Sequence, residues 1–287
     1  MGGEHDTGIE FHPWIDDLLE MTTLSNGIRV CTEKTNSQTA TIGVHVGAGS
    51  RQDTLATSGA AHALRTMLSH GTSAHSKSDF AMEIETMGAR FSGETGREHS
   101  NIEVTCFKND VRKVVSMLGD AVSSANLDAA DFELCKQQLA AEHDESSGDY
   151  QRTTLENCHF NAYRDHMMGQ PIKGESDNLA NLTVDDLQNY RALNYFGDNI
   201  VIVGTGNVNH DEFVNEVNAG FQSVSKTASG ARPNTEKNVY TPSLLFIRDD
   251  EMYNSNIGVF YDAPSVKHQD YYSFLLLKHM FGSYRID

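Results

Sequence analysis

The stretch GAAHALRTMLSHGT, residues 59–72, decides how the rest of the chain is interpreted. Its small residues favour an α-helix, and His62 lies within that helix. Far downstream, Glu142 falls on the apolar face of another expected helix, where an unpaired carboxylate is costly. These two residues can share a metal ion, but catalytic zinc needs three protein ligands and a nearby carboxylate base. From the residues alone, His62 is expected to be a hydrogen-bonded core histidine.

Strand and helix patterns surround this stretch. β-branched and apolar runs predict strands at residues 28–34, 40–46, 101–107 and 199–203. Capping residues predict helices that begin near Ser76, Asp128, Thr183 and Asn209, and a further apolar face recurs at helical spacing from Val111 to Val122. The order of these elements predicts an α+β domain, with an antiparallel or mixed sheet and helices packed on it.

The chain divides into three parts by composition. Residues 18–222 hold the elements described above, and residues 223–243 are polar and punctuated by Gly and Pro, which predicts a linker. A second part, residues 244–287, is expected to contain strands at 244–248 and 256–261 and then a helix. One strand pair and one helix cannot bury a core of their own. This part is therefore expected to be the start of a second domain, apparently incomplete.

Charge and hydropathy exclude some classes of function. The 287 residues carry a formal net charge of −18, so the chain lacks the basic footprint of a nucleic-acid binder. The acidic balance either suits basic ligands, such as positively charged presequences, or serves solubility alone. No apolar run approaches the roughly 20 residues that cross a bilayer. The N-terminal residues have no pattern of a signal or transit peptide.

Residues 59–72 resemble the inverted zinc motif H-x-x-E-H of the pitrilysin-type metallopeptidases, in the processing-peptidase form G-x-A-H-F-L-E-H-M-x-F-K-G-T. Seven positions match without a gap: Gly59, Ala61, His62, Leu64, Met67, Gly71 and Thr72. Five further stretches are similar to family motifs: LSNGIRV (24–30), GAGSR (47–51), ETMGA (85–89), REH (97–99) and QLAAE (138–142). The REH form is similar to the β-subunit or core 1 branch. The resemblance implies two similar α+β halves, of which this chain holds the first and the opening of the second.

The resemblance to the zinc motif is lost at positions that bind zinc and activate water. His62 matches the first zinc ligand and Glu142 the third, but Thr66 stands for the second histidine. Arg65 stands for the glutamate that would activate water, and a permanently protonated guanidinium cannot be a base. The resemblance therefore implies a degenerate zinc motif, with no catalytic, cofactor-binding or metal residue. One hypothesis from these residues is that Arg65 and Glu142 pair and neutralise each other.

A degenerate zinc motif within a sequence of the β-subunit type resembles the core subunits of the mitochondrial cytochrome bc1 complex. The resemblance implies a scaffold on the matrix side of the inner membrane, bound peripherally, and no nucleic acid. Its implied partners are a core 2 or α-type subunit, cytochrome b, cytochrome c1 and the Rieske protein, with a separate chain for the missing half. The alternatives are a presequence-binding or processing subunit of the processing peptidase, and a scaffold role in another inner-membrane assembly such as an ATP synthase. No cofactor is expected.

Overall fold

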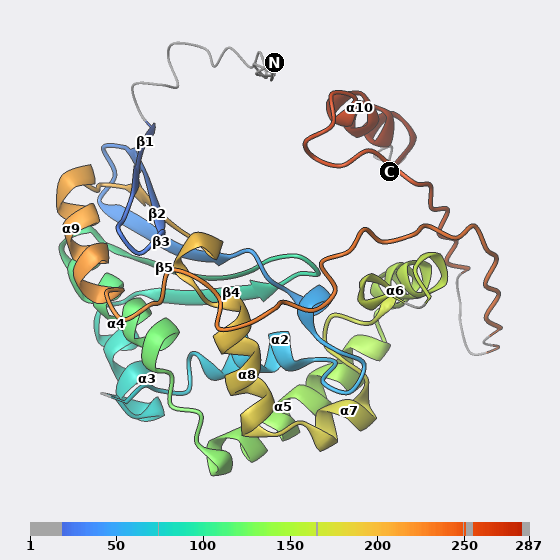
Figure 1. Ribbon diagram of the computed structural model, residues 1–287, viewed down its shortest axis with the longest axis horizontal. Coiled ribbons are helices and arrows are strands. Elements are labelled where there is room, and N and C mark those ends of the chain that lie inside the picture. Colours follow the sequence, from blue (N-terminus) through green and yellow to red (C-terminus); the bar gives the residue numbers. More distant parts are fainter. Residues whose placement is uncertain (1–18, 74, 165, 249, 251–254, 283–287) are drawn as a thin grey trace.

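A computed structural model describes residues 19–282, apart from residues 74, 165, 249 and 251–254. Its centre is a six-stranded mixed sheet with the strand order β1-β2-β6-β3-β5-β4 (Figure 1). The strands are β1 (Leu19–Thr23), β2 (Arg29–Lys34), β3 (Thr39–Val46), β4 (Arg90–Thr95), β5 (Ser100–Phe107) and β6 (Ile200–Gly206). The β2–β6 pair is parallel and the other pairs are antiparallel. The predicted mixed sheet of an α+β fold is confirmed.

The helices gather on one side of the sheet, except for the C-terminal helix, which lies away from the sheet (Figure 1). They are α2 (Ala60–Met67), α3 (Lys77–Thr86), α4 (Val111–Ser124), α5 (Ala129–Ser147), α6 (Tyr150–Ala162), α7 (Ser176–Asn181), α8 (Val184–Asn194), α9 (His210–Gly220) and α10 (Tyr271–Gly282). Short 3-10 turns lie at Ser50–Gln52, Lys108–Asp110, Met167–Gly169 and Gly197–Asn199. These connections leave α2 and α5 side by side beneath the sheet, and the candidate site lies between them.

The sheet is buried on one face only, as its sequence alternation dictates. In β5, Ile102, Val104 and Cys106 are buried, while the residues between them are half-buried or exposed. From the helix layer, α4 supplies buried side chains at helical spacing, among them Val115 and Leu118. Each fully buried side chain of this size contributes about 1.5–3 kcal/mol of hydrophobic stabilisation. The core therefore fixes both the register of β5 and the rotation of α4.

Helix ends follow the predicted capping chemistry. The Ser76 side chain accepts a hydrogen bond from the Asp79 backbone N–H, and Asp79 reaches back to the Ser76 backbone. The same reciprocal pair begins α8 at Thr183 and Asp186. Gly88, just after α3, has a φ of +60°, in the left-handed region that ends helices at glycine. The local signals for these helices are therefore confirmed.

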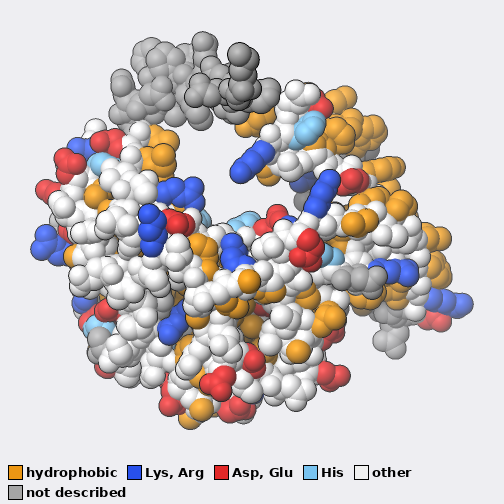
Figure 2. Space-filling view, viewed as in Figure 1, with side chains coloured by type: hydrophobic (Ala, Val, Ile, Leu, Met, Phe, Trp, Pro, Cys, Tyr) orange, Lys and Arg blue, Asp and Glu red, His pale blue; other side chains and the backbone are white. Residues whose placement is uncertain are grey.

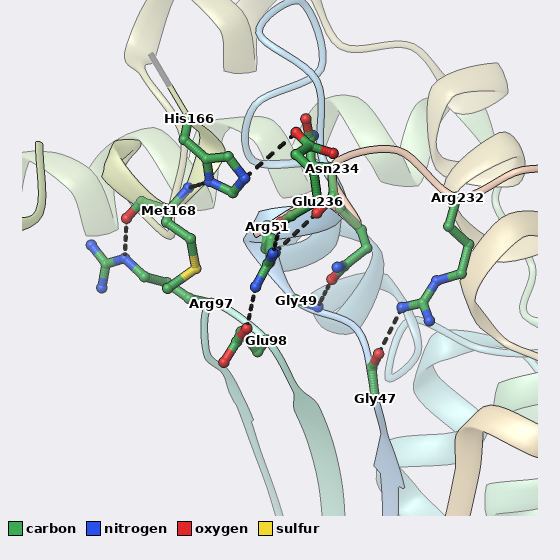
Figure 3. A network of polar contacts seen from close by, with 11 residues as sticks. Gly47, Gly49, Arg51, Arg97, Glu98, His166, Met168, Arg232, Asn234 and Glu236 are labelled. Carbon is green, nitrogen blue, oxygen red and sulfur yellow. Dashed lines mark hydrogen bonds and ion pairs between the residues drawn. The ribbon is translucent and has the colours of Figure 1, made fainter. Parts of the chain in front are cut away.

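Residues 223–243, predicted as a linker, run as irregular chain, and part of that chain is fixed to the end of the sheet. We call residues 232–236 the strap (Figure 3). Arg232 donates from Nη2 to the Gly47 carbonyl at 2.7 Å, and Asn234 donates from Nδ2 to the Asp53 carbonyl at 2.6 Å. Arg51 Nε donates to the Asn234 carbonyl at 2.9 Å. The strap therefore holds a defined position beside the turn that precedes α2.

Arg51 is the centre of this network, with its side chain 13% exposed. Its guanidinium also donates to the Glu236 carbonyl and pairs with Glu98 at 2.5 Å (Figure 3). We expect Arg51→Ala to lower the free energy of unfolding by about 1–2 kcal/mol, because two strap carbonyls lose their donor. Urea denaturation measures this loss, and trypsin cleavage after Lys237, which directly follows the strap, should become faster. Arg51→Lys is the comparison variant, because it keeps the positive charge but loses the planar fork of the guanidinium. If the strap of Arg51→Ala resists trypsin as well as the strap of wild type, the assignment is contradicted.

The segment after the strap differs from its prediction. Residues 244–248 and 256–261, expected as a strand pair, run as irregular chain outside the β-ladders of the described residues. A strand needs a neighbour for its backbone groups, and none of the described segments provides one here. The helix predicted after them is present as α10. The division into 18–222, 223–243 and 244–287 stays a prediction, and residues 18 and 283–287 lie outside the described residues.

Large apolar side chains of this segment are exposed. They include Leu244, Phe246, Ile257, Val259, Tyr261, Tyr272, Leu276, Met280 and Phe281. Figure 2 shows hydrophobic side chains gathered over α10 and the adjoining chain. A contiguous exposed apolar surface of this kind is typical of an interaction site. Across the described residues, none of the helices is long and apolar enough to span a membrane.

Candidate functional site

The site is built on α2, whose start is fixed by a buried carboxylate. Asp53 accepts hydrogen bonds from the backbone N–H groups of Gly59 at 2.9 Å and Ala61 at 3.0 Å. Burial raises the pKa of Asp53 well above its ordinary value, and these two backbone hydrogen bonds oppose the shift. An acceptor at this position satisfies donors that the first turn of a helix cannot satisfy itself. Asp53 therefore sets the direction in which α2 presents His62.

His62 of α2 meets Glu142 of α5. The two atoms His62 Nε2 and Glu142 Oε2 are 3.5 Å apart, and the side chains are 8% and 35% exposed. Burial, and next the Arg65 guanidinium, lower the pKa of His62 to about 4, while Glu142 opposes the shift. His62 is therefore a neutral, buried histidine at neutral pH. Its Nε2 makes only this long contact and lacks a hydrogen bond of normal geometry within the described chain, whereas its Nδ1 lies within hydrogen-bonding distance of Arg65 Nη2. The predicted hydrogen-bonded core histidine is therefore confirmed at one ring nitrogen.

Arg65 and Thr66 lie one turn further along α2. Among the described residues, Arg65 and Glu142 do not approach within 4 Å, so the hypothesis that they pair is wrong. Instead, Arg65 Nη2 lies 3.5 Å from His62 Nδ1, and the buried Arg65 Nε lacks an acceptor in the described structure. Burial lowers the pKa of Arg65, and Glu142 opposes this at longer range. The Thr66 hydroxyl donates to the His62 carbonyl at 3.0 Å, which is a bond within its own helix.

Sequence reasoning missed the partner that Glu142 does have. Lys173 donates from Nζ to the Glu142 backbone carbonyl at 3.1 Å, and its Nζ lies 3.8 Å from Glu142 Oε2. The lysine side chain is 16% exposed. Gln138 adds a hydrogen bond to Glu142 Oε1 at 3.3 Å from the preceding turn of α5. Nothing in the local pattern PIKG (171–174) signals this contact, since it depends on how a loop returns to α2.

These residues do not fit a zinc ion. Catalytic zinc takes three protein ligands, and here two side chains, those of His62 and Glu142, carry suitable atoms. The Thr66 hydroxyl is already engaged, and Arg65 brings a positive charge against the His62 ring. Within the part of the chain that the structure describes, no three His, Cys, Asp or Glu side chains are grouped to hold a metal. The arrangement can hold α2 against α5.

A cavity of about 230 Å³ opens beside this cluster. It is lined from α5, α6 and the loop before α7, by His143, Arg152, Thr153, Glu156, Asn157, Pro171, Lys173 and Glu175. Glu156 is paired with Arg97 at 2.5 Å. Lys173 therefore lies in the cavity wall and also contacts Glu142. The other lining residues include acidic, basic and neutral side chains.

Two family models match successive parts of the chain. The model described as "Insulinase (Peptidase family M16)" matches residues 29–176, which is over half of the chain. This protein belongs to the M16 peptidase family. The model described as "Peptidase M16 inactive domain" matches residues 181–286. The resemblance to pitrilysin-type metallopeptidases is thereby confirmed at the level of the family.

Curated relatives of this M16 protein include β-subunits of the mitochondrial-processing peptidase. The subunit of Lentinula edodes is 30% identical over 270 residues, and the probable subunit of Schizosaccharomyces pombe is 32% identical over 269. The Homo sapiens subunit is 28% identical over 264 residues. Each alignment covers 92% of this chain but 58%, 59% and 54% of the relative, respectively. The chain thus spans somewhat over half the length of these relatives.

Solved structures of the same fold include bacterial proteins. A protease from Helicobacter pylori matches with a TM-score of 0.71 at 21% identity, over 77% of this chain and 54% of that chain. A peptidase M16 inactive domain from Pseudomonas fluorescens matches with a TM-score of 0.68 at 16% identity, over 75% of this chain and 52% of that chain. At these identities the likeness shows the fold alone.

Proposed function

We propose that this M16 protein is a non-catalytic scaffold subunit of mitochondrial respiratory complex III, of the core 1 type and derived from a processing-peptidase β-subunit. The observation that carries the proposal is the position of Arg65, 3.5 Å from the His62 ring on α2. A guanidinium cannot accept a proton from water, and its charge opposes a cation beside it. With Thr66 in the second ligand position, the family's zinc motif is degenerate, and the chain itself is not an enzyme.

A scaffold role also suits the exposed apolar surface over residues 244–282. Large exposed apolar surfaces commonly mark the sites where proteins bind one another. The partners that we propose are a core 2 or α-type subunit, cytochrome b, cytochrome c1 and the Rieske protein. This places the protein on the matrix side of the mitochondrial inner membrane, held peripherally through these partners.

A second candidate is a presequence-binding or processing subunit of the mitochondrial processing peptidase. The similarity to β-subunits of that peptidase favours it, since each alignment covers 92% of the chain. The net charge of −18 also suits positively charged presequences. In this alternative the chain binds presequences, or a partner completes a working site.

Native separation of gently solubilised mitochondrial membranes tests both candidates. We expect mass spectrometry to find peptides of this chain in the band that contains cytochromes b and c1. The second measurement is cleavage of a presequence peptide by protein recovered from the same band. The cleavage rate with the wild-type chain is compared with the rate with the His62→Ala variant. Migration in a smaller fraction with an α-type peptidase subunit, together with zinc-dependent cleavage lost in His62→Ala, would overturn the scaffold role in favour of the alternative.

A further inference from the structure

Two cations flank the contact between α2 and α5. Along one line of contacts, Arg65 lies 3.5 Å from His62, His62 lies 3.5 Å from Glu142, and Glu142 lies 3.8 Å from Lys173. Arg65 comes from α2 itself, whereas Lys173 comes from the loop before α7. A histidine and a glutamate that a metal ion would join in other proteins are thus held between two cationic side chains.

The loop places Lys173 through a close backbone approach to the start of α2. Gly59 and Gly174 both have a positive φ, +96° and +80°. A Cβ on Gly59 would lie 2.8 Å from the Lys173 carbonyl oxygen, and a Cβ on Gly174 would lie 2.5 Å from the Ser58 carbonyl oxygen. Only glycine permits both the conformation and the contact. Lys173 is therefore fixed against the same turn that presents His62, and is not a mobile surface lysine.

We propose that Lys173 is a built-in cation that, together with Arg65, takes the place of a metal ion between α2 and α5 and excludes divalent cations from this site. The ammonium group binds both the side chain and the backbone carbonyl of Glu142, so it occupies the carboxylate that a metal would need. A divalent cation at His62 and Glu142 would also meet its charge at close range. The proposal names a residue outside the zinc motif as a determinant of metal exclusion, and it does not depend on which assembly holds the protein.

The test restores the missing ligands with and without this lysine. One variant carries Arg65→Glu and Thr66→His, and a second adds Lys173→Met. In isothermal titration with ZnCl₂, we expect wild type to show no binding at this site, the first variant weak binding, and the second binding at least about tenfold tighter. Lys136→Met in the first variant is the matched control, because Lys136 of α5 likewise donates to a backbone carbonyl, that of Ala180, away from His62 and Glu142. Equal zinc affinity with and without Lys173 would overturn the proposal.

Single variants keep the proposal testable if the multiple variants do not fold. Lys173→Met should lower the melting temperature, because Glu142 loses its cation, while Lys173→Arg should retain most of it. Added ZnCl₂ should not restore Lys173→Met, since two ligands remain. A melting temperature of Lys173→Met equal to that of wild type would show that Glu142 does not depend on this cation, and would overturn the proposal. That result would leave the proposed function standing if the protein still migrates with cytochromes b and c1.

Discussion

Gly174→Ala is expected to lower the free energy of unfolding by about 2–5 kcal/mol, a large fraction of the stability of an ordinary domain. A left-handed φ costs a residue with a Cβ about 1–2 kcal/mol. The new methyl group would also lie 2.5 Å from the Ser58 carbonyl oxygen and 2.7 Å from the Gly59 Cα. Both are backbone atoms at the start of α2, so the clash is relieved only by moving that helix or the loop, at about 1–3 kcal/mol more.

Urea denaturation of the variant and wild type at neutral pH measures this loss. Gly148→Ala is the matched control, because the Cβ there would meet its nearest neighbour, the Glu145 carbonyl oxygen, at an ordinary distance of 3.5 Å. That change should stay within about 0.5 kcal/mol of wild type. A Gly174→Ala protein within about 1 kcal/mol of wild type would show that the loop does not pack on α2 as described.

The parts of the fold that depend on neighbouring residues were predictable from the sequence. In β5, the alternation from Asn101 to Phe107 was sufficient, because a strand buried on one face imposes a period of two. The capping pair at Ser76 and Asp79 was sufficient for α3, since its hydrogen bonds lie within one turn. Residues 244–248 have the same kind of composition but no neighbouring strand among the described residues. Whether such a run pairs is decided by segments far away in sequence.

The site was predictable only in part from the sequence. The motif resemblance correctly brought His62 and Glu142 together, although 80 positions separate them (142 − 62). The pairing of Arg65 with Glu142 was wrong, since the Arg65 chain extends toward the sheet: a Cβ on Gly93 of β4 would lie 3.1 Å from its Cδ. Lys173 was missed because its position depends on two glycines that permit a close backbone approach, and sequence periodicity carries no information about such a contact.

The stability of the protein should fall by about 2–3 kcal/mol between pH 7.5 and pH 4.5 through His62 alone. The ordinary pKa of 6.5 applies to the unfolded chain, and burial beside Arg65 lowers the pKa in the fold to about 4. The unfolded state therefore binds the proton first as pH falls, and stability present above pH 6.5 is lost down to about pH 4. One pKa unit corresponds to about 1.4 kcal/mol, which sets the magnitude.

Urea denaturation across this range, in wild type and in His62→Gln, isolates the contribution of this side chain. Burial also lowers the pKa of His70, His159 and His166, but these histidines titrate in both proteins, and their effect cancels in the difference. The wild-type curve should be steeper below pH 6.5. Parallel curves would show that His62 takes up its proton in the folded protein near its ordinary pKa.

Arg65→Met separates the two causes of the His62 shift. Burial is the larger cause and remains in this variant, whereas the neighbouring positive charge is removed. The pKa of His62, followed by NMR of its ring protons, should rise toward 6.5 without reaching it, and the pH dependence of stability should become shallower. An unchanged His62 pKa would mean that the guanidinium does not act on the ring, and the argument that Arg65 opposes a cation at this site would lose its electrostatic basis.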